Sequence, residues 1–244
     1  MQNEENQNIL ITGAGGAIGK GLTKYLLEKT NYRLTLSYYS ASEIPTYTKK
    51  YPDRITIVVG DISQQIILDT LFNNISTVIH LASSVSPNNY NQDWNNAYKF
   101  GADSTFAILD YIKNTKNKIH LIFPSSGGTV YSKKQNIPFV ETDIANGVSP
   151  YGIQKVMFEN YLKLLTGNNK NISCNILRIS NPYGLPVNSN RKQGFIDIII
   201  QKILNNEPIE LYSPVNTIRD YIYIDDLCSA FLKAIEYKNG LEIF

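Results

Sequence analysis

The chain has 244 residues, of which 43% are hydrophobic and 18% are charged. Its 23 basic and 21 acidic residues leave a formal net charge of +2, which gives no general attraction to nucleic acid or to an anionic membrane. No apolar stretch reaches the roughly 18 residues that a membrane span needs, and the polar start Met1–Asn8 is typical of neither a signal peptide nor an anchor. These features predict a cytoplasmic protein with no nucleic-acid or membrane partner.

The cysteines and histidines are too few for a disulfide-stapled or metal-bound fold. Cys174 and Cys228 both lie in apolar runs, which is typical of small buried thiols. His80 and His120 do not suffice for a histidine-rich metal site. We therefore predict no metal, and we interpret His80 as a strand residue with a hydrogen-bond partner nearby.

Short apolar runs alternate with helix-length segments through most of the chain. The expected strands are Ile9–Thr12, Leu34–Leu36, Ile55–Val59, Val78–Leu81, Ile119–Phe123 and Cys174–Ile179. The expected helices are Ala17–Lys29, Gln64–Phe72, Asp93–Ile112 and Tyr151–Leu165. Nearly continuous β-branched strands are typical of parallel sheets covered on both faces. The alternation predicts an α/β fold with a doubly wound parallel sheet.

The pattern changes after Ile179. The elements expected there are a loop over 181–194, a helix over Phe195–Leu204, the short run Ile222–Ile224 and a helix from Asp225 or Asp226. Because ligands bind at the carboxyl edge of such sheets, we expect this region to cap that edge. We therefore divide the chain into a core, 1–180, and the start of a ligand-capping region, 181–244.

A glycine-rich turn follows the first strand and opens the first helix. Gly13, Gly16 and Gly19 have the spacing G-x-x-G-x-x-G. Glycine permits a tight turn and a close approach of backbone to a pyrophosphate, which then lies on free N–H groups at the helix start. Chance predicts only about 0.05 such matches in a chain with this glycine content. The turn therefore predicts dinucleotide binding.

With the preceding Thr12, this turn resembles the fingerprint of the short-chain dehydrogenase/reductase superfamily, which acts through Tyr-x-x-x-Lys. Two such pairs occur. Tyr25–Lys29 lies at the end of the first helix and is interpreted as a surface coincidence. Tyr151–Lys155 begins a helix after the fifth strand, and Pro150 favours a helix start there. Residues four apart share a helix face, so both side chains can reach one bound molecule.

The resemblance implies that Tyr151 moves a proton at a sugar hydroxyl. A phenol is a poor base at neutral pH, but a nearby ammonium and a cationic nicotinamide favour the phenolate. Lys155 would supply that ammonium and also hold the nicotinamide ribose.

Further segments resemble the extended branch of the superfamily, the NAD-dependent nucleotide-sugar epimerases and dehydratases, and especially the UDP-glucose 4-epimerases. They are Gly60–Ile62, His80–Ala82, Ser125–Tyr131, Leu177–Gly184 and Arg219–Leu227. The resemblance runs from about residue 9 to residue 244, as one domain, and implies a Rossmann core with an incomplete substrate-capping region.

The family motifs imply a set of binding residues. Those implied for the cofactor are Gly13, Gly16, Ala17, Ile18, Gly19, Asp61, Ile62, Leu81, Ala82, Ser83 and Lys155. Asn181 is implied at the diphosphate of the nucleotide sugar, and Arg219 is implied to clamp a phosphate.

The active-site segment departs from the family pattern at Gly127, where a serine or threonine usually shares the sugar hydroxyl with the tyrosine. Ser126 or Thr129 could supply the missing hydroxyl, and Thr129 is preferred. The dehydratases carry Asp-Glu where this chain has Gly128 and Thr129, so a dehydratase is disfavoured.

The cofactor-binding segments also depart from the pattern. Ser37 replaces the acid that usually binds the adenosine ribose, and no arginine stands there to receive a 2′-phosphate. Gly101 replaces an asparagine of the fourth helix. We expect NAD, with NADP as the alternative.

The resemblance favours an NAD-dependent epimerase that oxidises and re-reduces C4 of a UDP-sugar in bacterial surface-polysaccharide synthesis. A 4-keto-sugar reductase and a catalytically silent cofactor- or nucleotide-sugar-binding protein are the alternatives. A homodimer is left open. The last strand, Leu241–Phe244, ends where family members continue, so a truncated chain is expected.

Overall fold

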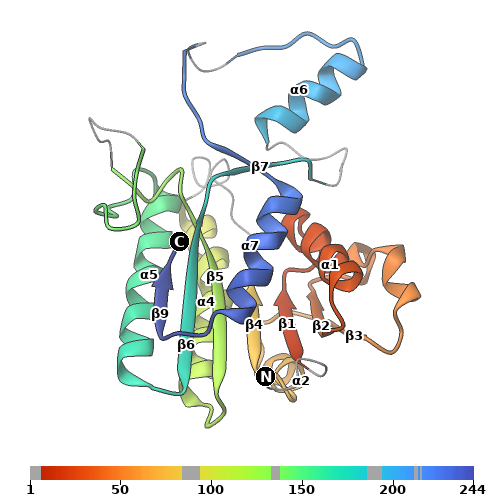
Figure 1. Ribbon diagram of the computed structural model, residues 1–244, viewed down its shortest axis with the longest axis vertical. Helices are drawn as coiled ribbons and strands as arrows, with labels where there is room; N and C mark the ends of the chain where they lie inside the picture. Colours follow the sequence, from red (N-terminus) through yellow and green to blue (C-terminus); the bar gives the residue numbers. More distant parts are fainter. Residues whose placement is uncertain (1–6, 84–93, 133–137, 186–193, 212–213, 215) are drawn as a thin grey trace.

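Parallel strands form the central sheet of the computed structural model, which describes residues 7–83, 94–132, 138–185, 194–211, 214 and 216–244, with only the backbone of 94–101 (Figure 1). In those residues the strand order is β3-β2-β1-β4-β5-β6-β9, and every neighbouring pair is parallel. The bounds are β1 (Asn8–Thr12), β2 (Arg33–Tyr38), β3 (Ile55–Val59), β4 (Thr77–His80), β5 (Ile119–Ser126), β6 (Ile172–Ile179) and β9 (Leu241–Ile243). The predicted doubly wound parallel fold is confirmed.

Helices cover both faces of the sheet. Helices α1 (Ala17–Lys29) and α7 (Ile224–Glu236) pack on one face, and α2 (Gln65–Leu71), α4 (Trp94–Asn114) and α5 (Pro150–Asn168) pack on the other. Successive β1 residues alternate between the two cores, because side chains of a strand point to opposite faces. The apolar character of nearly every strand residue follows from this double burial.

Helix α5 is positioned by its N-terminal cap. Ser149 Oγ accepts a hydrogen bond from the Gly152 N–H at 3.1 Å, and Pro150 occupies the first turn. The helix therefore begins one residue before the predicted Tyr151 and runs past the predicted end to Asn168. This cap places Tyr151 in the first turn, beside the carboxyl edge of the sheet.

The region after residue 180 contributes both to a separate small sheet and to the central fold. Strands β7 (Asn181–Tyr183) and β8 (Tyr221–Tyr223) form a small parallel sheet, so the predicted loop begins with a strand, and its residues 186–193 lie outside the described residues. By contrast, α7 packs on α1 and β9 pairs with β6. Part of the segment assigned to a capping region therefore belongs to the core.

Helix α6 (Phe195–Leu204) forms as predicted and stands apart from the central sheet in Figure 1. None of its residues is buried. Among the described residues, no helix combines the length and apolar character that a membrane crossing requires.

Candidate active site

The glycine-rich turn lies against the end of β4. Gly13 has a φ of +67°, and a Cβ built on it would lie 2.6 Å from the Ala82 backbone nitrogen. A Cβ on Gly19 would overlap the Gly13 carbonyl oxygen. Both positions therefore require glycine, the first for its backbone conformation and both for close backbone contact.

The start of α1 has the features of an anion-binding site. Its N-cap, Gly16, makes no side-chain capping hydrogen bond, and no acidic residue lies in its first turn. Ala17 and Ile18 are the first two helical residues. N–H groups that no side chain caps, together with the helix dipole, favour a phosphate here, so the turn fits the pyrophosphate of a dinucleotide.

Thr12 links the end of β1 to the end of β4 by hydrogen bonds. Its Oγ1 accepts the Ala82 N–H at 3.2 Å and lies 2.8 Å from His80 Nδ1, and its carbonyl accepts the Leu81 N–H. His80 Nε2 lies 3.1 Å from Thr105 Oγ1. This arrangement holds the backbone of Leu81 and Ala82 beside the glycine turn.

His80 is a buried structural residue. Burial, assisted by the Lys155 charge, lowers the pKa of His80 to about 3, so its ring is neutral. With hydrogen-bonding groups at both ring nitrogens, the prediction of a satisfied strand histidine is confirmed. Ser83, the last of the predicted cofactor residues after β4, is exposed.

Asp61 follows β3 at the same edge of the sheet. Its Oδ1 accepts hydrogen bonds from the Ser63 N–H at 2.9 Å and from Ser63 Oγ at 2.8 Å, which orients the carboxylate. The neighbouring Ile62 side chain is buried in the core among α2 and β3 residues. A cofactor contact by Ile62 would therefore be made through its backbone.

Tyr151 and Lys155 face one another at the start of α5. The Lys155 Nζ lies 5.6 Å from the centroid of the Tyr151 ring and 4.8 Å from that of Phe123, and it donates to the Pro124 carbonyl at 2.9 Å. Burial lowers the pKa of Lys155 to about 8, against the opposing effect of Glu159. Burial raises the pKa of Tyr151 to about 12, so the phenol is protonated at neutral pH.

The structure accounts for the missing serine at the end of β5. A Cβ on Gly127 would lie 2.8 Å from the Arg178 carbonyl oxygen, and the Gly127 N–H donates to the Ile179 carbonyl at 2.8 Å. A side chain at 127 would collide with the backbone of β6.

The two candidate replacement hydroxyls lie in different surroundings. Thr129 Oγ1 is buried and, in the described part of the chain, has no hydrogen-bond partner. A Cβ built on Gly152 would overlap the Thr129 carbonyl oxygen, so the backbone of Thr129 lies close against the start of α5. Ser126 is half-buried at the last position of β5.

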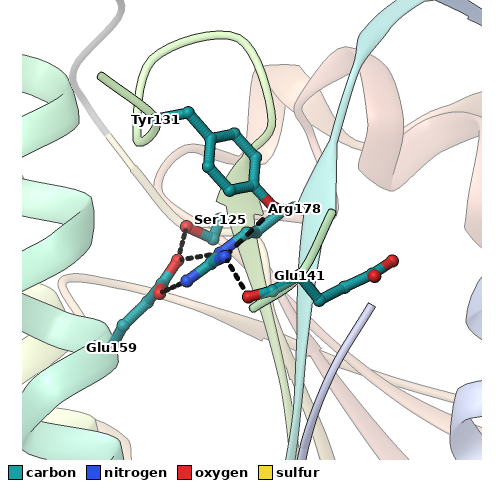
Figure 2. Close-up of polar contacts among 5 residues, drawn as sticks. All are labelled: Ser125, Tyr131, Glu141, Glu159 and Arg178. Atoms are coloured by element: carbon teal, nitrogen blue, oxygen red, sulfur yellow. Dashed lines mark hydrogen bonds and ion pairs between the residues drawn. The ribbon is translucent and has the colours of Figure 1, made fainter. Parts of the chain in front are cut away.

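A polar network joins Arg178 and Glu159 to Ser125, Tyr131 and Glu141 (Figure 2). The Arg178 guanidinium forms a bidentate ion pair with Glu159, at 2.7 Å and 3.2 Å, and Ser125 Oγ donates to the same carboxylate at 2.6 Å. The Arg178 Nη1 also donates to Tyr131 Oη at 3.0 Å and to the Glu141 carbonyl at 2.9 Å. The network joins α5, β5, β6 and the segment that follows β5.

Sequence reasoning missed this ion pair. Glu159 lies one helical turn after Lys155, on the same buried face of α5, and its side chain is only 1% exposed. An acid four residues after the lysine, on the buried face, was the available signal.

The predicted substrate residues lie together at the small sheet. The Asn181 backbone N–H and side-chain amide both donate to the Asp220 carbonyl, at 3.1 Å and 2.8 Å. Arg219, the next residue towards the N-terminus, is exposed, and its Nη1 donates only locally, to the Ile218 carbonyl. Within the described ranges, no group of three or more potential metal ligands is assembled.

Together the sheet order, the glycine turn and the uncapped start of α1 define a dinucleotide-binding Rossmann protein. The sequence model of the NAD dependent epimerase/dehydratase family matches residues 9–243, and the chain belongs to this family. The predicted family resemblance is confirmed.

Among curated proteins, the chain is 37% identical to a dTDP-4-dehydro-6-deoxyglucose reductase from Escherichia coli, over 97% of this chain and 75% of that protein. It is 30% identical to a putative UDP-glucose 4-epimerase from Methanocaldococcus jannaschii, over 96% of this chain and 75% of that protein. Among solved structures, UDP-glucose 4-epimerase from Thermotoga maritima, in complex with UDP-glucose, superposes with a TM-score of 0.84 at 24% identity, over 98% of this chain and 76% of that one. This structural likeness shows the fold.

Proposed function

We propose that the chain interconverts a hydroxyl and a ketone at C4 of a nucleotide sugar, with NAD or its phosphorylated form as the hydride carrier. The observation that carries the proposal is the Tyr151–Lys155 pair, set by a capped helix start at the carboxyl edge beside a glycine turn that fits a dinucleotide. The bound cofactor would accept or give a hydride. The chain's own residues would bind the sugar and transfer the proton to or from its C4 oxygen.

Tyr151 is the residue that we assign to the proton at the C4 oxygen. Lys155, whose ammonium faces the Tyr151 ring, would stabilise the phenolate when the proton leaves. Thr129 or Ser126 would orient the same oxygen. Because His80 is neutral and buried, it would hold β4 in place without exchanging the proton.

The reductive direction is the first candidate. The Escherichia coli protein at 37% identity is named for reduction of a 4-keto sugar, and this identity exceeds the 30% to the putative epimerase. Burial also keeps Tyr151 protonated at rest, because its pKa is raised to about 12. A resting phenol is the form that can give a proton to a ketone as the hydride arrives.

Epimerisation at C4, favoured by the sequence motifs, is the second candidate. Its support is the 30% identical putative UDP-glucose 4-epimerase and the shared Tyr–Lys pair. An epimerase returns the hydride to the sugar and consumes no cofactor, whereas a reductase consumes reduced cofactor with each turnover.

The deciding experiment supplies dTDP-4-dehydro-6-deoxyglucose with NADH or NADPH and follows absorbance at 340 nm. A parallel reaction supplies UDP-glucose without added cofactor and measures the 4-epimer by chromatography. Oxidation of reduced cofactor supports the reductase, and cofactor-free epimer formation supports the epimerase. If neither reaction occurs but NAD and the nucleotide sugar bind tightly, the chain is a catalytically silent binding protein.

A further inference from the structure

The glycine-rich turn contains one glycine that pyrophosphate binding does not explain. A Cβ built on Gly15 would lie 2.6 Å from Glu43 Oε2 and 2.9 Å from Glu43 Cβ. The φ of Gly15 is not in the left-handed region, so the backbone conformation does not require glycine here. Gly15 therefore leaves the space that the Glu43 side chain takes, and the carboxylate lies against the turn.

Local hydrogen bonds place Glu43. It ends the short 3-10 helix Ala41–Glu43, in which Ser40 Oγ accepts the Ser42 N–H and the Ser40 carbonyl accepts the Glu43 N–H at 3.1 Å. A few residues later, Tyr47 Oη donates to the Lys20 carbonyl of α1 at 3.0 Å. This hydrogen bond thus ties the segment after β2 to α1, the helix that follows the glycine turn.

The end of β2 itself offers no acid. Ser37 is only 3% exposed, and its carbonyl accepts the Ala14 N–H at 3.1 Å. Tyr38 is fully buried, and its hydroxyl has no hydrogen-bond partner in the described part of the chain. In Rossmann sites an acid at this edge accepts hydrogen bonds from the adenosine ribose, so this chain needs that acid from elsewhere.

The charge of residues 37–43 also favours a ribose hydroxyl over a phosphate at this edge. From Ser37 to Glu43 the only charged residue is Glu43, and no lysine or arginine is present. A 2′-phosphate at this edge would meet a carboxylate with no basic residue of that segment to offset the repulsion. A 2′-hydroxyl would instead find a carboxyl oxygen that can accept its hydrogen bond.

We propose that Glu43, admitted by Gly15, is the residue that accepts hydrogen bonds from the adenosine ribose and makes the site select NAD over NADP. This inference rests on the dinucleotide-binding part of the proposed function. It assigns to Glu43 the task that the usual acid performs at the position of Ser37.

The test measures dissociation constants of NAD⁺ and NADP⁺ by calorimetry for the parent chain, Glu43→Gln and Glu43→Arg. The parent should bind NAD⁺ at least about tenfold more tightly than NADP⁺. Glu43→Gln should weaken NAD⁺ about tenfold without weakening NADP⁺, and Glu43→Arg should reverse the preference. Glu28→Gln is the matched control, because Glu28 pairs with Lys24 on the exposed face of α1.

Gly15→Ala provides a second, independent variant. The added methyl would displace the Glu43 carboxylate, so NAD⁺ should weaken more than NADP⁺ while far-UV circular dichroism stays unchanged. Equal loss of both dinucleotides in the Glu43 variants, or a preference that does not change, would overturn the inference and leave the proposed function standing. A parent chain that binds neither dinucleotide would overturn both.

Discussion

At the scale of single residues, burial sets the resting ionisation of the candidate catalytic pair. The pKa of Tyr151 is raised to about 12 and that of Lys155 is lowered to about 8, both chiefly because burial disfavours the charged form. At neutral pH the site therefore holds a neutral phenol beside an ammonium. A bound cation that stabilises the phenolate would lower the pKa of Tyr151 from this raised value.

Replacing the phenol tests its role. Tyr151→Phe should lower turnover by at least about 10²-fold, because a general acid–base group is removed, while NAD binding stays within a few-fold. The measurement is steady-state kinetics with calorimetric binding of NAD. Tyr161→Phe, on the same helix and 46% exposed, is the control and should leave turnover unchanged. Parent-like turnover in Tyr151→Phe would remove Tyr151 from the mechanism.

The Thr129 hydroxyl, which has no hydrogen-bond partner among the described residues, allows a test with two readouts. A buried hydroxyl without a hydrogen bond lowers stability, so Thr129→Val should raise the free energy of unfolding by about 1 kcal/mol. If Thr129 replaces the missing serine, turnover should fall further in this variant than in Ser126→Ala. A larger loss of turnover in Ser126→Ala would transfer the role to Ser126, and two silent variants would mean that the site needs no hydroxyl there. Urea unfolding and kinetics on the same preparations give both values.

At the scale of elements, the Arg178–Glu159 pair joins α5 to β6. Both side chains are nearly inaccessible, at 4% and 1% exposure. A buried pair is weak evidence for net stability, because desolvation of two charges offsets their attraction. Its consequence is geometric, since it fixes the helix that carries Tyr151 against the strand that carries Arg178 (Figure 2).

A double-mutant cycle separates these effects. Glu159→Leu leaves the Arg178 charge buried without its counter-ion, and Arg178→Met does the same to the Glu159 charge. Each single variant should therefore lower the free energy of unfolding by about 3–5 kcal/mol. The double variant Glu159→Leu/Arg178→Met should lose clearly less, because no unpaired charge remains buried. Chemical denaturation provides the values. Additive losses in the double variant would contradict the description of a coupled pair.

At the scale of the whole molecule, two buried histidines make stability depend on pH. Burial lowers the pKa of His80 to about 3 and that of His120 to about 4. At His120 the hydrogen bond to the Ala234 carbonyl opposes this shift, and the Lys238 charge adds to it. The His120 ring nitrogens each lie 2.8 Å from an oxygen, Ser173 Oγ and the Ala234 carbonyl, so the neutral ring links β5 to β6 and α7.

The sign of the effect follows from proton uptake. Below about pH 6.5 the unfolded chain protonates both histidines and the folded chain does not, so stability is full above pH 6.5 and falls towards pH 4. Each histidine contributes up to about 1.4 kcal/mol per pH unit. His120→Asn should lower stability at pH 7.5 but reduce the loss between pH 6.5 and 5. Urea unfolding at several pH values that gives the same loss for variant and parent would exclude His120 as a source.

The apolar surface of α6 is the other molecular-scale feature. Its Phe195, Ile200, Ile203 and Leu204 side chains are 54%, 50%, 58% and 76% exposed. A group of exposed apolar residues on one helix favours association. Ile203→Glu should therefore reduce concentration-dependent self-association in light scattering while NAD binding is kept. Ile66→Glu is the control, because Ile66 is a comparably exposed residue of α2. An equal effect of the two variants would show that α6 is not the associating surface.

The sequence by itself determined the features that depend on local pattern. Strand and helix order, the glycine turn and the Tyr–Lys pair were all predictable, because periodicity, glycine spacing and a four-residue interval on a helix are local properties. The start of α5 was predictable to within one residue from Ser149 and Pro150. Strand β7 was not, because its three residues form a strand only against β8, 40 positions later.

Tertiary structure decided which distant residues meet. Glu43 lies 28 positions from Gly15, and Arg178 lies 19 positions from Glu159, so the local sequence does not show that the two members of either pair meet. The collision that excludes a side chain at Gly127 comes from the backbone of β6, which only the folded sheet brings there. The ionisation of Tyr151, Lys155 and His80 likewise depends on burial, which is set by the packing of elements across the whole chain and not by their neighbours in sequence.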